Sequence, residues 1–498
     1  MSNPTRIPSI YASILFQSRV NPFATAVNYD SKEVTYRQFC IDIEKVTRRL
    51  HRMELPPGSR VVVHIHHIYL RWLANIALVR MGMLSSALSD SGKELEFLNP
   101  RLVLTDRPGN ITGRTAVEAG SHWLSDEAND WPAFEDFEHD INAPCRMVVS
   151  SGTTGLPKKA VLTYGDLRNR VRGTARTYGL NATARLMTTM GTATVGGFSM
   201  PVSCWSSGGA CLLATLPPGQ PISHVLAARP NVLFMAPGQL AALLETLPRD
   251  YWPWQHLVVY VAGSTLPPAV SRAARARLTQ SLFIIYGSTE TGTVTLTHAA
   301  MADERPGFIG YVIPGAQVQI VDDQGQRVAN GKMGEIRIQS DGLVAGYADE
   351  PGVTDEAFRE GWFYPGDAGV MDNEGGLRIV GRTRELMNLG GVKIAPELIE
   401  QSLASVPGIA DMAVFALSAP AGDQPWVAVI PEDGFVDSAL VQQFAKAFPR
   451  LPLISVARID KIPRNEMGKV MRTQLAATVQ NAIARTGTET VQLAKPSA

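Results

Sequence analysis

The first third of the sequence alternates between helix-like and strand-like segments. Apolar residues recur at helical spacing over 35–53 and 69–83, whereas 60–64 and 102–105 are short runs rich in valine and leucine. Strands that alternate with helices in this way form parallel sheets with helices packed on their faces. We therefore predict an α/β fold whose large N-terminal part is built on parallel-rich sheets covered by helices.

From about Gly307 the pattern changes to short strand-like runs separated by turn-forming residues. Two short strand-like runs, 318–321 and 334–338, flank the sequence Asp322-Asp323-Gln324-Gly325, which is rich in turn-forming residues. This pattern predicts a β-rich subdomain at the end of the large domain.

The last part of the chain has elements of its own. After Arg382 come strand-like runs over 412–417 and 426–430 and helical spacing over 438–448. These residues are expected to form a small second domain of the α+β type.

Composition and charge exclude several classes of protein. Of the 498 residues, 45% are hydrophobic and 18% are charged, and 46 basic residues balance 46 acidic ones. A chain of this composition can bury large cores, so intrinsic disorder is excluded. A net charge of zero supplies no long-range attraction to nucleic acids or anionic membranes, so neither is an expected partner.

The cysteines and the apolar segments indicate the compartment. Cys40, Cys145, Cys204 and Cys211 lack CxxC or CxxxC spacing, so they predict neither a zinc site nor a disulfide framework and favour a reducing compartment. The N-terminus lacks the basic and apolar stretches of a secretory signal. No run reaches the ~18 apolar residues that a membrane span needs. We expect a cytoplasmic protein without a membrane span.

The strongest local feature is a loop of small and hydroxyl residues after a strand-like run. It reads Val148-Val-Ser-Ser-Gly-Thr-Thr-Gly-Leu-Pro-Lys158 and includes Ser150, Ser151, Gly152, Thr153, Thr154 and Gly155. Glycines let backbone N–H groups approach a phosphate, hydroxyls add donors and a lysine adds a positive charge. A Walker-type P-loop would need Gly-Lys-Ser/Thr where this chain has Pro157-Lys158-Lys159, so that class is excluded. Taken alone, the run also fits a plain surface loop.

Six further segments accompany this loop in a fixed order. The segments are Tyr286-Gly-Ser-Thr-Glu290, Gly346-Tyr347, Gly361-Trp-Phe-Tyr-Pro-Gly-Asp367, Gly381-Arg-Thr-Arg-Glu385, Gly390-Gly-Val-Lys-Ile-Ala-Pro-Glu397 and Pro463-Arg-Asn-Glu-Met-Gly-Lys469. Together with the loop they resemble the adenylate-forming superfamily of AMP-dependent synthetases and ligases, which includes acyl-CoA synthetases, peptide-synthetase adenylation domains and luciferases. The resemblance extends over nearly the whole chain, from Pro22 to Lys469.

The resemblance implies an ATP-dependent carboxylic acid ligase. The acid would attack the α-phosphate of ATP to give an acyl-adenylate and pyrophosphate, and a thiol would then displace AMP. The implied domains are residues 1–383, which bind ATP and the acid, and residues 384–498, a mobile domain that rotates about a hinge at Arg384.

The resemblance also implies roles for individual residues. The loop from Ser150 to Lys158 would hold the β- and γ-phosphates, Glu290 would bind Mg²⁺, and Thr289 would donate to the α-phosphate. Lys469 would bridge the attacking carboxylate and the α-phosphate, since a flexible ammonium can follow the developing charge. The other implied contacts to the nucleotide are Gly263, Tyr286, Gly287, Ser288, Asp367 and Arg382, and those to the thiol are Gly390 and Gly391.

The predicted substrate is a small-molecule carboxylic acid without an α-amino group. Relatives that activate amino acids place an aspartate in the acid pocket, and this chain has none between Asp166 and Asp250. A buried ammonium without a carboxylate would be costly. The wall is small and apolar, which suits an aliphatic or aryl acid; its residues are Ala193, Val195, Gly196, Gly197 and Phe198.

The thiol acceptor leaves an alternative open. CoA is the first choice, and the phosphopantetheine arm of an acyl carrier protein is the second, because the same channel admits both. A luciferase-type oxygenase is a rival within the superfamily, and a non-catalytic nucleotide-binding protein is a rival from another class. The retention of Thr289, Glu290, Asp367, Arg382 and Lys469 speaks against the loss of catalysis. The oligomeric state is left open.

Overall fold

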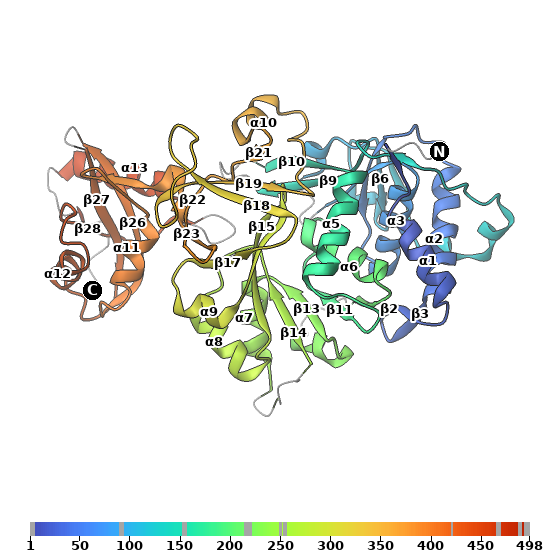
Figure 1. The fold of residues 1–498 in the computed structure, drawn as a ribbon, viewed down its shortest axis with the longest axis horizontal. Coiled ribbons are helices and arrows are strands. Elements are labelled where there is room, and N and C mark those ends of the chain that lie inside the picture. The colour runs from blue at the N-terminus through green and yellow to red at the C-terminus, as the bar shows by residue number, and fades with distance from the viewer. Residues whose placement is uncertain are drawn as a thin grey trace. The chain divides into compact units, whose positions relative to one another are not determined.

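The computed structural model describes residues 5–88, 94–151, 157–213, 222–248, 251, 256–419, 422–464, 470–486 and 491–492 (Figure 1). The chain forms two compact units. Unit 1 contains residues 1–319, 337–365 and 372–378, and unit 2 contains residues 320–336, 366–371 and 379–498. Among the described residues, no helix is long and apolar enough to cross a membrane.

The first sheet of unit 1 has six strands in the order β10-β9-β5-β4-β6-β7. All neighbours are parallel except β10, which returns antiparallel to β9. The predicted strands over 60–64 and 102–105 are confirmed with the predicted bounds. The strands are β4 (Arg60–His64), β5 (Leu84–Ala87), β6 (Leu102–Thr105), β7 (Ala116–Glu118), β9 (Pro144–Ser151) and β10 (Pro157–Thr163).

The second sheet of unit 1 is centred on parallel strands in the order β2-β12-β11-β13-β14-β15. Strand β3 continues it antiparallel at one side, and β16 and β17 continue it antiparallel at the other. The predicted α/β class is therefore confirmed. The strands are β2 (Thr25–Tyr29), β3 (Lys32–Thr35), β11 (Arg185–Thr188), β12 (Ala210–Leu213), β13 (Val232–Met235), β14 (Val258–Val261), β15 (Leu282–Ser288), β16 (Gly292–His298) and β17 (Phe308–Val312).

Helices pack against both sheets. The predicted helix over 35–53 is confirmed as α2, and the Thr35 hydroxyl caps it by accepting from the Gln38 amide at 3.3 Å. Buried tyrosine and tryptophan side chains link two of the helices to each other and to a strand. Tyr36 donates to the Trp205 carbonyl at 3.0 Å, and Trp205 donates to the Ala26 carbonyl at 2.9 Å. The helices are α1 (Tyr11–Val20), α2 (Tyr36–His51), α3 (Ile68–Arg80), α4 (Leu95–Leu98), α5 (Tyr164–Thr177), α6 (Val195–Ser206), α7 (Pro237–Thr246), α8 (Pro268–Arg277) and α9 (Ala299–Glu304).

The predicted β-rich segment is confirmed. The turn between its first two strands is held by Asp322, whose Oδ1 accepts from the Gln324 and Gln326 amides at 2.9 Å each. The segment contains β18 (Ala316–Val321), β19 (Met333–Ser340), α10 (Pro351–Ala357), β20 (Phe358–Arg359), β21 (Trp362–Phe363), β22 (Asp367–Met371) and β23 (Gly376–Arg382).

The C-terminal part of unit 2 is of the α+β type, as predicted. A four-stranded sheet in the order β26-β27-β28-β29 packs with helices on its faces (Figure 1). The half-buried guanidinium of Arg472 pairs with Glu385, Glu397 and Glu400 at 2.8–3.0 Å. The elements are β24 (Met387–Leu389), β25 (Val392–Ile394), α11 (Pro396–Leu403), β26 (Ile409–Ala419), β27 (Gly422–Pro431), α12 (Asp437–Ala447), β28 (Ser455–Arg458), α13 (Arg472–Thr486) and β29 (Val491–Gln492).

Candidate active site

The candidate site begins at the carboxyl ends of the parallel strands of the second sheet. Strand β14 ends at Val261, and its register pairs Val261 with Ile284 of β15, so Gly263 lies level with Tyr286. In parallel α/β sheets ligands bind at this edge, where the loops of neighbouring strands meet. The predicted nucleotide contacts Gly263, Tyr286, Gly287 and Ser288 therefore come from one sheet edge.

A tight turn follows Ser288, the last residue of β15, and carries the two predicted catalytic residues Thr289 and Glu290. A Cβ at Gly287 would lie 2.1 Å from the Gly292 carbonyl oxygen, so only glycine fits there. The Ser288 hydroxyl accepts from the Glu290 and Thr291 amides at 3.2 Å each. Ser288 thus fixes the shape of the turn from within.

The predicted phosphate loop joins β9 to β10. These strands form a hairpin in which Ser150 is paired with Lys158. Ser151 ends β9, and the predicted loop residues Gly152, Thr153, Thr154 and Gly155 lie outside the described residues. Lys158 is only 8% exposed, and its Nζ lies 4.9 Å from the ring centroid of Tyr347. A cation over an aromatic face is stabilised by the ring quadrupole.

Glu290 brings three segments of unit 1 together. Its side chain is buried, and Oε1 accepts from the Ser150 hydroxyl at 3.2 Å and from the Tyr347 hydroxyl at 2.8 Å. Burial, and then the charge of Glu290, raise the pKa of Tyr347 well above its ordinary range, so the phenol stays protonated and donates. One hydrogen-bonded cluster therefore joins the strand before the predicted phosphate loop, the predicted metal ligand Glu290 and the Gly346-Tyr347 segment.

The donor set of this cluster fits Mg²⁺. Magnesium is commonly held through one or two carboxylates together with substrate phosphates and water. Throughout the part of the chain that the structure describes, no group of three or more His, Cys, Asp or Glu could hold a metal by itself. The buried carboxylate of Glu290, with the Ser150 hydroxyl beside it, matches a magnesium site that substrate phosphates and water complete.

The predicted ribose contact and a second predicted nucleotide contact lie in unit 2. Asp367 begins β22 and is 6% exposed, and its Oδ1 lies 3.0 Å from Nη1 of Arg382, the last residue of β23. The Thr383 amide donates to the Gly366 carbonyl at 2.8 Å, which holds the two strand ends side by side. Because a buried carboxylate is costly without a partner, Arg382 stabilises and orients Asp367.

The predicted thiol-channel glycines form the turn between β24 and β25. Gly390 and Gly391 have φ of 64° and 88°, the left-handed conformation that two-residue hairpin turns require. Nothing lies within 4 Å of a Cβ built on either glycine, so the turn borders open space within unit 2. Lys469 lies outside the described residues.

The hydrogen bond from Tyr347 to Glu290 is not predicted from the sequence. The Gly346-Tyr347 motif supports the resemblance, but the resemblance implies no role for its phenol. Glu290 is 57 residues away in the sequence, so only the fold reveals the hydrogen bond between them. The available signal was an aromatic residue with a hydroxyl inside a motif of a nucleotide-binding family.

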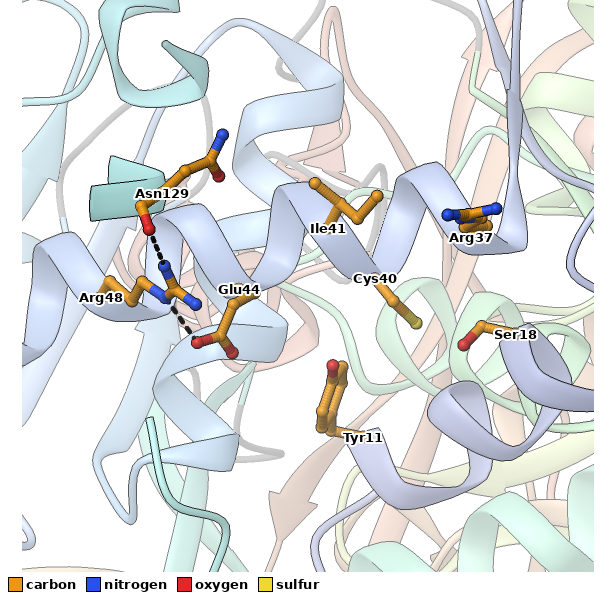
Figure 2. A pocket seen from close by; sticks show the side chains of 8 residues that line it. All are labelled: Tyr11, Ser18, Arg37, Cys40, Ile41, Glu44, Arg48 and Asn129. Atoms are coloured by element: carbon orange, nitrogen blue, oxygen red, sulfur yellow. Dashed lines mark hydrogen bonds and ion pairs between the residues drawn. The ribbon is translucent and has the colours of Figure 1, made fainter. Parts of the chain in front are cut away.

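A surface pocket of about 410 Å³ lies elsewhere in unit 1, between α1 and α2 (Figure 2). Arg48 in its wall is already engaged, by Glu44 at 2.7 Å and by the Asn129 carbonyl at 3.0 Å. None of the predicted site residues lines it. The lining residues are Tyr11, Ser18, Arg37, Cys40, Ile41, Glu44, Arg48 and Asn129.

The sequence and the fold match known proteins over most of their length. The profile of the AMP-binding enzyme family matches residues 16–348. Indoleacetate–CoA ligase from Aromatoleum aromaticum is 27% identical over 496 residues, which cover 92% of this chain and 96% of that protein. Feruloyl-CoA synthase from an Amycolatopsis species is 27% identical over 484 residues, with the same coverage of both chains. The crystal structure of ATP-bound MatB from Rhodopseudomonas palustris superposes with a TM-score of 0.79 at 23% identity, covering 94% of this chain and 99% of that one.

Proposed function

The chain belongs to the AMP-binding enzyme family and is an ATP-dependent ligase of the acyl-CoA synthetase type, and we propose that it joins an aryl or aliphatic carboxylic acid to CoA. The observation that carries this proposal is the cluster in which Ser150 and Tyr347 donate to the buried carboxylate of Glu290 while Lys158 faces the Tyr347 ring. It provides cationic and hydroxyl groups for a triphosphate and one carboxylate for the accompanying metal.

In the first half-reaction a carboxylate oxygen attacks the α-phosphorus, and the bond from that phosphorus to the pyrophosphate oxygen breaks. Two anions must approach each other, so positioning and charge neutralisation dominate the barrier. Glu290 would hold Mg²⁺, which would supply charge neutralisation at the phosphates. Lys158 adds a buried positive charge beside the loop, and Lys469 bridges the acid and the α-phosphate.

In the second half-reaction the CoA sulfur attacks the acyl carbonyl carbon. The thiol loses its proton, the bond from the carbonyl carbon to the AMP oxygen breaks, and AMP leaves. Gly390 and Gly391 border the path of the pantetheine arm, because their turn leaves open space where side chains would stand. A carrier-protein phosphopantetheine would use the same path.

The wall proposed for the acid pocket supports an acid without an α-amino group. A Cβ at Gly196 would lie 2.7 Å from the Phe234 ring, and one at Gly197 would lie 2.2 Å from the Gly191 carbonyl oxygen, so the wall requires glycine. Behind it lies the buried guanidinium of Arg146, 2.5 Å from the Thr192 carbonyl oxygen and stacked on Phe198. A buried cation disfavours a substrate ammonium nearby, and the two relatives above are named for aryl acids.

The test is acid-dependent ATP–pyrophosphate exchange over a panel of aryl, fatty and amino acids. We expect exchange with one or more aryl or aliphatic acids and none with amino acids. CoA or a holo acyl carrier protein, added afterwards, identifies the thiol acceptor from the thioester that forms. Exchange only with amino acids would contradict the substrate class, and no exchange with any acid would favour the non-catalytic nucleotide-binding alternative.

A further inference from the structure

Arg170 of α5 carries a positive charge into the interior of unit 1. It is 7% exposed, and burial lowers its pKa to about 10, so the guanidinium remains charged at neutral pH. No described carboxylate forms an ion pair with it. Its three nitrogens donate instead to backbone carbonyls: those of Gly342 at 2.8 Å, Thr289 at 2.9 Å and Glu290 at 2.6 Å.

Two of these carbonyls belong to the turn that carries the predicted catalytic residues. Hydrogen bonds from a charged donor are about twice as strong as neutral ones, so Arg170 fixes the peptide groups of Thr289 and Glu290 from behind. The Glu290 carbonyl also accepts from the Val344 amide at 3.0 Å. The backbone of Glu290 is therefore held from two sides.

The third carbonyl belongs to the segment that leads to Tyr347. Arg170 binds the Gly342 carbonyl, and its neighbour Asn169 donates to the Asp341 carbonyl at 2.7 Å. A Cβ at Gly342 would lie 2.5 Å from Cγ of Arg170, so the segment and the arginine are in direct contact. One side chain thus sets the distance between the two segments whose side chains meet in the hydrogen bond from Tyr347 to Glu290.

We propose that Arg170 is a positioning residue for the metal–triphosphate site: it holds the Thr289–Glu290 turn and the segment before Tyr347 in the arrangement that binds ATP with Mg²⁺. This inference rests on the proposed function of Glu290. The charges of Asp166 and Glu290 act on the guanidinium, but its hydrogen bonds go to the carbonyls of these two segments. This pattern favours such a role over a general structural one.

The test compares Arg170→Lys, Arg170→Met and the control Arg172→Met. Arg172 lies two residues further along α5 and is exposed, so its loss removes the same charge from the same helix without touching the turn. Isothermal titration calorimetry measures the Kd for ATP with excess Mg²⁺ and again with EDTA, and circular dichroism measures folding and Tm. We expect Arg170→Met to lose about tenfold or more of the Mg²⁺-dependent gain in affinity. Arg170→Lys should lose less, because an ammonium can keep part of the bonding.

The outcomes separate the two proposals. A folded Arg170→Met protein with a wild-type ratio of the two Kd values would overturn the positioning role. If Arg170→Met does not fold, a wild-type ratio in Arg170→Lys would overturn it equally. Equal losses with Mg²⁺ and with EDTA would show a merely structural role and would also overturn it. A wild-type protein that binds no ATP under either condition would instead overturn the proposed function.

Discussion

At the scale of residues, Tyr347 makes two separable contributions to the site. Its ring faces the ammonium of Lys158, and its hydroxyl donates to the carboxylate of Glu290. Glu290 also accepts from Ser150, so the phenol is one of two described side chains that donate to this carboxylate. Removal of the hydroxyl alone should therefore affect Glu290, the proposed metal ligand, and leave the ring contact in place.

We expect Tyr347→Phe to raise the Mg²⁺ concentration needed for half-maximal ATP–pyrophosphate exchange by about tenfold, because a hydrogen bond to a charged group contributes about 1.5–3 kcal/mol. Tyr347→Ala should lose more, since it also removes the ring from Lys158. Tyr311→Phe is the control, a tyrosine of the same unit whose ring packs on Phe308. An unchanged Mg²⁺ requirement in Tyr347→Phe would show that Ser150 alone orients Glu290.

The residues of the site could be predicted only in part from the sequence. Motif positions such as Glu290 and Asp367 were identified because the resemblance carries them. The partners Tyr347, Arg170 and Arg382 could not be assigned their contacts, because each contact joins segments that are separate in the sequence and meet only in the fold. The resemblance also implies Gly390 and Gly391. Their positive φ values give a separate, physical reason for glycine at both positions.

At the scale of elements, the central strands were the easiest to predict. The central residues of β4 and the whole of β6 are buried, and both strands contain three consecutive valine or leucine residues. Helix α3 ends at Arg80, three residues before the predicted end, because Gly82 adopts a left-handed φ of 79° and the chain turns into β5. Helix α12, by contrast, was predicted within one residue at each end.

The short strand β8 (His139–Asp140) links the N-terminus to α5 and contains a buried histidine. His139 pairs with Ile7 of β1 (Arg6–Ile7), and its ring stacks on Tyr164, the first residue of α5, with ring centroids 4.0 Å apart. Its Nε2 is buried without a hydrogen-bond partner among the described residues. Burial lowers the pKa of His139 to about 4 from 6.5, although the nearby charge of Asp136 acts in the opposite direction.

This histidine should make stability depend on pH. A group whose pKa is depressed by folding binds its proton more readily in the unfolded chain, so its neutral form stabilises the fold fully above pH 6.5. The stabilisation falls as the pH drops from about 6.5 to about 4, by at most about 3 kcal/mol. Urea unfolding at a series of pH values measures it, and His139→Phe should flatten the curve in that window. The exposed His122 provides the control His122→Asn, and identical curves for His139→Phe and wild type would contradict the assignment.

At the scale of the whole molecule, the two compact units do not follow a single cut in the sequence. Residues 320–336 and 366–371 belong with 379–498, so the proposed hinge at Arg384 lies inside unit 2. Across that point Lys393 pairs with Asp323 at 3.1 Å, and both side chains are largely exposed. Exposed ion pairs contribute about 0–1 kcal/mol, so this pair is a weak restraint on the rotation that we propose.

The proposed rotation assigns Lys469 to one half-reaction only. Lys469→Ala should slow acid-dependent ATP–pyrophosphate exchange by at least about 100-fold, the usual cost of losing a group that stabilises transition-state charge. Thioester formation from a synthetic acyl-adenylate and CoA should stay within about twofold of wild type, because the proposed rotation withdraws the lysine in that step. Lys461→Ala is the matched control, an exposed lysine of the same segment, and both of its rates should be unchanged. If Lys469→Ala slowed both half-reactions equally, the proposal that Lys469 acts only in adenylate formation would be wrong.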